Sequence, residues 1–132
     1  MKTAIILSIL GLGLAQAAFA ETRYVCSFPA GRDDFIPETV QLAVDTSTWR
    51  AQVLEKFTKA KHGGAIAAKA KRRDGKSIQF NWEVEVPYTR NRTSQADYRI
   101  ILNHTNMTAS LRGDIPGNID PSIARGRCRV AN

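Results

Sequence analysis

The chain has 132 residues, 19 of them lysine or arginine and 12 aspartate or glutamate, which gives a formal net charge of +7. This length indicates one domain with a hydrophobic core, and the lack of an apolar run of membrane length after residue 20 excludes a membrane-spanning domain. The excess positive charge favours an anionic polymer, a lipid headgroup or an acidic protein surface as partner, or serves solubility alone.

The first 20 residues have the layout of a secretory signal peptide. Lys2 precedes an apolar run from Ala4 to about Leu14, and Ala18-Phe19-Ala20 places small residues at both positions that a signal peptidase recognises. The run is short for a membrane span, although a retained anchor is the alternative. A short, lysine-led signal is typical of bacteria, so we expect export to the periplasm or the medium. We expect the exported part, residues 21–132, to form a single β-domain.

Cys26 and Cys128 are the only cysteines, so only one intrachain pairing exists. In an oxidising compartment we expect that pair to be a disulfide. It would tie the start of the exported chain to its end, and a closed loop of about 100 residues gives about 4–5 kcal/mol in the chain-entropy model.

Apolar and polar residues alternate with a period of two through most of the exported chain, which predicts half-buried strands. The alternating runs cover 22–28, 39–45, 76–86, 98–104, 107–113 and 123–130. The run at 76–86 is the clearest, and its apolar face consists of Ile78, Phe80, Trp82, Val84 and Val86.

Turn residues separate these runs. Asp74-Gly75 predicts a hairpin, and segments 44–49 and 103–106 predict two further turns. We expect Pro87 to end the clearest strand, residues 88–97 to form a polar, basic loop, and the Pro- and Gly-containing segment 113–122 to form a longer loop.

Segment 47–62 fits both a helix and a strand. Trp49, Val53, Phe57 and Ala60 share one helical face, with Ser47 or Thr48 as a cap and Gly63 as a stop. The same segment also alternates, and because its neighbours are strands we predict a strand there. The alternating lysines and alanines of 65–73 predict another.

Seven or eight antiparallel strands in one domain predict a small all-β fold, either an up-and-down barrel or a sandwich. A disulfide between the first and last strands would bring those strands together. That arrangement closes a meander into a barrel without exposed edges, although two sheets bridged across a core fit nearly as well.

No catalytic or metal-binding motif stands out. His62 and His104 lack a companion at metal-ligand spacing, and the carboxylate pairs Asp33-Asp34 and Glu83/Glu85 lie in a loop and on a polar strand face. We therefore expect a protein that is not an enzyme and needs neither metal nor cofactor.

The basic residues carry the positive signal for a binding site. Our candidate anion-binding residues are Arg125, Arg127, Arg129, Lys69, Lys71, Arg72 and Arg73. Arginines at every second strand position lie about 6–7 Å apart, which suits successive anionic groups. The alternative is that carboxylates on neighbouring strands, such as Glu83 and Glu85, neutralise the arginines. Aromatic residues do not interleave with these cations, which disfavours a nucleic-acid site.

Residues 23–28, Arg-Tyr-Val-Cys-Ser-Phe, resemble the first strand of the small periplasmic C-type lysozyme inhibitors, in which Tyr24 and Cys26 match a Tyr-x-Cys pattern. The resemblance implies an exported barrel that acts through a protein interface. Members also carry a serine- and glycine-containing loop that ends in Arg-Tyr, and this chain lacks such a loop. Their partner is a basic enzyme, and the positive charge of this chain would repel it.

These observations favour a small exported domain that binds an anionic envelope component. One alternative is an inhibitor or accessory subunit that acts through a protein interface, with 113–122 as the protruding loop. Another is a barrel that holds a small apolar ligand, although a small barrel fills its interior with its own side chains.

Overall fold

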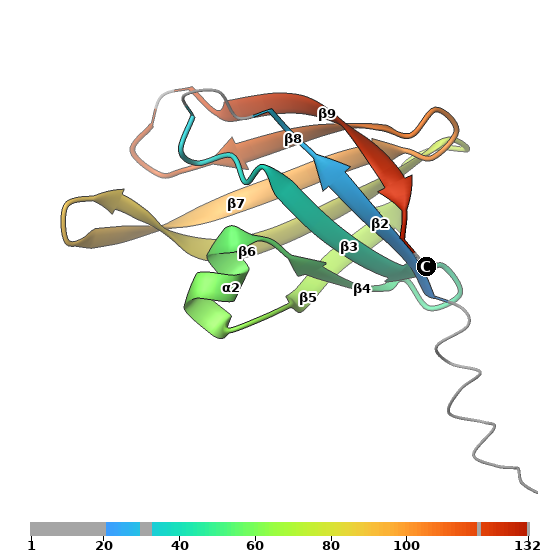
Figure 1. Ribbon diagram of the computed structural model, residues 1–132, viewed down its shortest axis with the longest axis horizontal. Helices are drawn as coiled ribbons and strands as arrows, with labels where there is room; N and C mark the ends of the chain where they lie inside the picture. The colour runs from blue at the N-terminus through green and yellow to red at the C-terminus, as the bar shows by residue number, and fades with distance from the viewer. Residues whose placement is uncertain (1–20, 30–32, 119, 132) are drawn as a thin grey trace, which may run out of the picture.

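The computed structural model describes residues 21–29, 33–118 and 120–131 (Figure 1). The predicted signal peptide, residues 1–20, lies outside the described residues.

Eight strands form a closed antiparallel barrel in which each strand pairs with its neighbours along the chain and β9 pairs back with β2. The fold is therefore an up-and-down barrel and not a sandwich. Its strands are β2 (Glu21–Ser27), β3 (Thr39–Asp45), β4 (Arg50–Leu54), β5 (Ile66–Arg72), β6 (Ser77–Thr89), β7 (Arg92–Asn103), β8 (Thr108–Asp114) and β9 (Ser122–Val130).

The alternation in the sequence places the apolar side chains inside the barrel. In β6, Phe80, Trp82 and Val84 are at most 4% exposed, and the same face of β7 buries Tyr98 and Ile100 completely or nearly so. The ring of Tyr98 stacks between those of Trp82 and Phe57, with centroids 5.4 and 6.2 Å away. Large side chains of the protein itself thus fill the interior.

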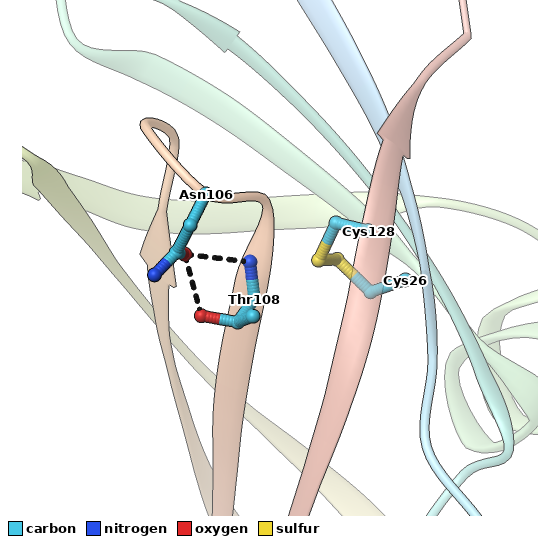
Figure 2. The surroundings of a disulfide bond; sticks show 4 residues. All are labelled: Cys26, Asn106, Thr108 and Cys128. Carbon is cyan, nitrogen blue, oxygen red and sulfur yellow. Dashed lines mark hydrogen bonds between the residues drawn. A yellow bond between two sulfur atoms is a disulfide. The ribbon is translucent and has the colours of Figure 1, made fainter.

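The Cys26–Cys128 disulfide closes the barrel. The two cysteines lie directly opposite each other on β2 and β9, with their Cα atoms 4.0 Å apart (Figure 2). Gly126 makes this approach possible, because a Cβ at that position would lie 2.0 Å from the carbonyl oxygen of Ser27. The predicted link between the first and last strands is confirmed.

The prediction of a strand over 47–62 is correct only for β4. The following residues form helix α2 (Lys56–His62), which begins at a capping box. The carboxylate of Glu55 accepts hydrogen bonds from the backbone N–H groups of Phe57 and Thr58, and the Thr58 hydroxyl accepts one from the Glu55 N–H. Gly63 ends the helix in a left-handed conformation with φ of 78°, as the helical alternative predicted.

The expectation that Pro87 ends its strand and that 88–97 is a loop is wrong. β6 continues to Thr89 with an irregularity between Pro87 and Thr89, and β7 begins at Arg92. Beyond Asn81, the described pairing of β6 is with β7 alone. Proline is tolerated there because one side of the strand has no ladder to donate to.

The barrel has two different ends (Figure 1). One end carries the short turns 46–49, 73–76 and 104–107 together with residues 21 and 131, and we name it the turn end. The opposite end carries residues 33–38, α2, the tip of the β6–β7 hairpin and residues 115–118 and 120–121, and we name it the loop end.

Candidate functional site

The three arginines of β9 lie on the outside of the barrel. Arg125, Arg127 and Arg129 are exposed, whereas the alternating residues Ala124, Gly126 and Cys128 face inward and are partly buried. The two-residue period predicted that these arginine side chains point outward, and this prediction is confirmed.

The residues opposite these arginines are uncharged. Arg125 lies opposite Ser110 of β8, and Arg127 lies between Thr108 of β8 and Ser27 of β2. Arg129 lies opposite Val25 of β2. The hydroxyl of Thr108 donates to Asn106 Oδ1 at 2.7 Å, within the adjoining turn (Figure 2).

The expected neutralisation by Glu83 and Glu85 does not occur. Both carboxylates belong to β6, which is not a neighbour of β9 in the barrel. Glu85 instead pairs with Lys61 at 2.8 Å, and Glu83 accepts a hydrogen bond from Gln95. Within the described part of the chain, no ion pair includes an arginine of β9.

Two further arginines flank β9 on its neighbouring strands. Arg112 of β8 pairs with Asp114 at 3.0 Å, and Arg23 of β2 pairs with Glu21 at 2.8 Å. Each of these pairs lies two residues apart on one exposed strand, so it contributes little to stability. We call the outer surface of β8, β9 and β2 the β9 face, and cations outnumber carboxylates on it.

An open depression of about 1130 Å³ adjoins this face. Arg125 and Arg127 line it, with hydroxyl groups from Ser110 and Thr108 and the partly buried Ile101. Glu38 is the one carboxylate among its lining residues. The depression therefore offers the guanidinium groups and the Ser110 hydroxyl as donors to an anionic group, because the Thr108 hydroxyl already donates to Asn106.

The structure does not bring the β5 residues of the predicted set to this site. Lys69, Lys71 and Arg72 are exposed on β5, which lies four strands from β9 in either direction around the barrel. Arg73 follows β5 in the turn, where its guanidinium donates to Gln79 Oε1 at 2.9 Å. The lysines of α2 lie at the loop end of the barrel (Figure 1).

Alternation around β5 still creates a second, smaller group of cations. Lys69 lies directly opposite Arg50 of β4, and both are exposed. Like charges in that position repel each other. The predicted set thus divides into two basic surfaces on opposite sides of the barrel.

A cleft at the loop end was not predicted from the sequence. It has a volume of about 1170 Å³ and apolar walls from Phe35, Phe57 and Tyr88. The rings of Phe35 and Tyr88 stack with centroids 6.2 Å apart, and the Tyr88 hydroxyl donates to Asn118 Oδ1 at 3.0 Å. The walls of the cleft come from four separate segments of the chain, so no local sequence pattern could have revealed it. The loop that we expected to protrude, 113–122, supplies only one of these walls.

The charges in the cleft are partly matched already. Lys61 pairs with Glu85, and the ammonium of Lys56 lies 4.9 Å from the centre of the Phe57 ring. Asp33 Oδ1 accepts the backbone N–H of Phe35 at 2.9 Å, and Asp34 is exposed beside it. The charge left over in the cleft is therefore acidic.

A buried carboxylate lies beneath this cleft. Glu55 is 3% exposed, and its Oε2 accepts a hydrogen bond from Trp82 Nε1 at 3.0 Å. Burial raises the pKa of Glu55, while the hydrogen bonds from Trp82 and from the start of α2 act in the opposite direction. Burial also raises the pKa of Tyr98, whose hydroxyl donates to the carbonyl of Phe35 at 2.6 Å.

Carboxylates gather on the outside of the barrel between the two basic surfaces. Glu83, Asp97 and Asp114 lie side by side on β6, β7 and β8. Desolvation raises the pKa of Asp97, and the two facing carboxylates raise it further. This acidic row crosses the strands that lie between β5 and β9 on one side of the barrel.

Comparisons with protein-family models, with curated proteins and with solved structures found no match to this chain. The resemblance to the C-type lysozyme inhibitors is therefore carried by Tyr24 and Cys26. In the described ranges, the barrel has no helix that is both long and apolar enough to cross a membrane.

Proposed function

We propose that this protein is a small exported binding domain that recognises an anionic component of the cell envelope through the β9 face. The observation that carries the proposal is the row Arg125, Arg127 and Arg129, which is exposed and whose directly opposite residues in the described ladders to β8 and β2 are all uncharged. A row neutralised by its own sheet would have carboxylates at those positions.

The compartment is part of the proposal. A disulfide that closes the barrel fits an oxidising location, and the N-terminal sequence predicts export. In that setting anionic groups are abundant on envelope polymers and lipid headgroups. Because side chains of the barrel fill its interior, a surface site is favoured over an internal ligand.

The test uses residues 21–132, which contain every strand of the closed barrel. Binding to heparin and to lipopolysaccharide is measured across a salt series, because anion binding weakens steeply as salt rises. The site variant replaces Arg125, Arg127 and Arg129 with serine. Its matched control replaces Lys69, Lys71 and Arg72 with serine, which removes the same charge from the opposite side of the barrel.

We expect the β9 variant to lose binding and the β5 variant to retain most of it. Equal losses in the two variants would mean that overall charge, and not the β9 face, attracts the anion. No binding of the unmodified protein to either probe at low salt would contradict the proposal altogether.

A second candidate function uses the loop-end cleft as a protein interface. Its support is the combination of stacked Phe35 and Tyr88 with the acidic Asp33 and Asp34, which suits a basic side chain presented by a partner. The resemblance to lysozyme inhibitors makes a C-type lysozyme the first partner to try. Inhibition of its lytic activity that Tyr88→Ala abolishes would support this function, and full activity at saturating protein would contradict it.

A further inference from the structure

We propose that the β9 face docks onto the surface of an anionic lipid bilayer, with its arginines at the phosphate groups and Ile123 in the interfacial region. This inference rests on the proposed function and names the source of the anion. It is carried by apolar side chains that share the face with the arginines.

The described surface exposes two large hydrophobic residues, and both lie on β9. Ile123 is 60% exposed and Val130 is 50% exposed. Alternation places Ile123 on the same side of the strand as the three arginines. Val130 falls on the Cys128 side of the strand and lies at the turn end of the barrel.

Ile123 lies beside two arginines, one of which, Arg112, pairs with Asp114. It lies directly opposite Arg112 of β8 and two residues before Arg125 on its own strand. At the other end of the row, the partly buried Val25 lies opposite Arg129. Apolar and cationic side chains therefore occupy one outward surface.

The adjoining depression repeats this combination. Ile101 of β7 lies opposite Ser110, which in turn lies opposite Arg125. Ile101 lines the depression together with Arg125 and Arg127. A hydrophobic side chain thus lies within the site where an anionic headgroup would be held.

A lipid surface uses both kinds of side chain, whereas a hydrophilic polyanion uses only one. Each arginine near an anionic bilayer strengthens binding about fivefold. Arginine also lays its aliphatic stem along apolar material while the guanidinium stays at the phosphates. Burial of Ile123 at the interface adds about tenfold, which a polymer such as heparin cannot supply.

The experiment compares two probes on the same variants. The first probe is vesicles of phosphatidylglycerol and phosphatidylcholine, with pure phosphatidylcholine vesicles as the uncharged reference, and the second is heparin. The test variant is Ile123→Ser, and the matched control is Val130→Ser, which removes the other exposed hydrophobic residue of the same strand.

We expect Ile123→Ser to weaken binding to the anionic vesicles about tenfold and to leave heparin binding unchanged. Val130→Ser should change neither. An Ile123→Trp variant should show a blue shift of its tryptophan emission on anionic vesicles and none with heparin.

The failures of the two proposals are distinguishable. If the arginine variant loses vesicle and heparin binding but Ile123→Ser behaves like the unmodified protein on both probes, the lipid inference is wrong and anion binding by the β9 face stands. If heparin binds and anionic vesicles do not, the partner is a hydrophilic polyanion. If neither vesicles nor heparin bind at low salt, the lipid inference fails, and the proposed function fails with it when lipopolysaccharide does not bind either.

Discussion

Trp82 Nε1 donates a hydrogen bond to Glu55 Oε2 at 3.0 Å, although 27 residues separate the two in the chain. The other oxygen of Glu55 accepts from the first turn of α2. One buried carboxylate thus joins the core of the barrel to the helix that forms a wall of the loop-end cleft, and it needs both of its oxygens as acceptors.

Replacement of Glu55 with glutamine should destabilise the protein by about 1–3 kcal/mol, because the amide NH₂ leaves one of the two donors without an acceptor. Unfolding in urea measures the change. In a Trp82→Phe background the indole donor is absent, so the same replacement should have a clearly smaller effect. Equal effects in both backgrounds would show that the Glu55–Trp82 bond carries no coupling.

The raised pKa of Glu55 predicts how this difference depends on pH. A carboxyl group whose pKa is higher in the folded state binds its proton more tightly when the protein is folded. Its contribution to the free energy of unfolding is therefore fully present below the ordinary pKa of 4.5, and it declines as pH rises through the folded-state pKa. The stability gap between the unmodified protein and Glu55→Gln should therefore narrow above pH 4.5. The pKa values of Asp45, Asp74 and Asp97 are also shifted. These residues are present in both proteins, so their effects cancel in the difference between the two stabilities. A gap that widens with pH would reverse the sign.

Loss of the disulfide should lower the free energy of unfolding by about 4–5 kcal/mol, because it closes a loop of 102 residues. The Cys26→Ala, Cys128→Ala double variant tests this, and chemical reduction of the unmodified protein provides the comparison without a change of side chain. Retention of full stability after reduction would mean that the pairing of β2 with β9 alone holds the barrel closed.

Gly126→Ala should destabilise the barrel by about 1–3 kcal/mol, since the new methyl group would overlap the Ser27 carbonyl and strands β2 and β9 must move apart. Gly75→Ala is the matched control, because nothing lies within 4 Å of a Cβ at that position. Thermal unfolding of the two variants should differ by several degrees. Similar melting temperatures would show that the contact between β2 and β9 relaxes easily.

Replacement of Arg125, Arg127 and Arg129 with serine should leave the free energy of unfolding within about 1 kcal/mol of its original value. The three side chains are exposed and form no ion pair with the other described residues, and such side chains contribute little. Equilibrium unfolding in urea is the measurement. A loss of several kcal/mol would show that the arginines are structural partners, and it would also undermine the binding tests that depend on this variant.

Much of the barrel could be predicted from local pattern. Alternation in runs such as 76–86 placed Phe80 and Trp82 inside and Glu83 and Glu85 outside, since a strand sends successive side chains to opposite faces whatever its neighbours are. The same rule placed the β9 arginines outside and Cys128 inside. Local pattern failed at Glu55, where an acidic residue acts as a helix cap although serine, threonine, aspartate and asparagine are the usual caps.

By itself the sequence determined the alternating faces, the pairing of its only two cysteines and the excess of positive charge. Only the tertiary structure decided that the meander closes as a barrel, that β9 lies beside β8 and β2 and away from Glu83 and Glu85, and that four distant segments form the loop-end cleft. The physical reason is that the direction of a side chain depends on its own strand. The charges and hydrophobic groups that it meets depend on which strands the closed hydrogen-bond ladder places beside it.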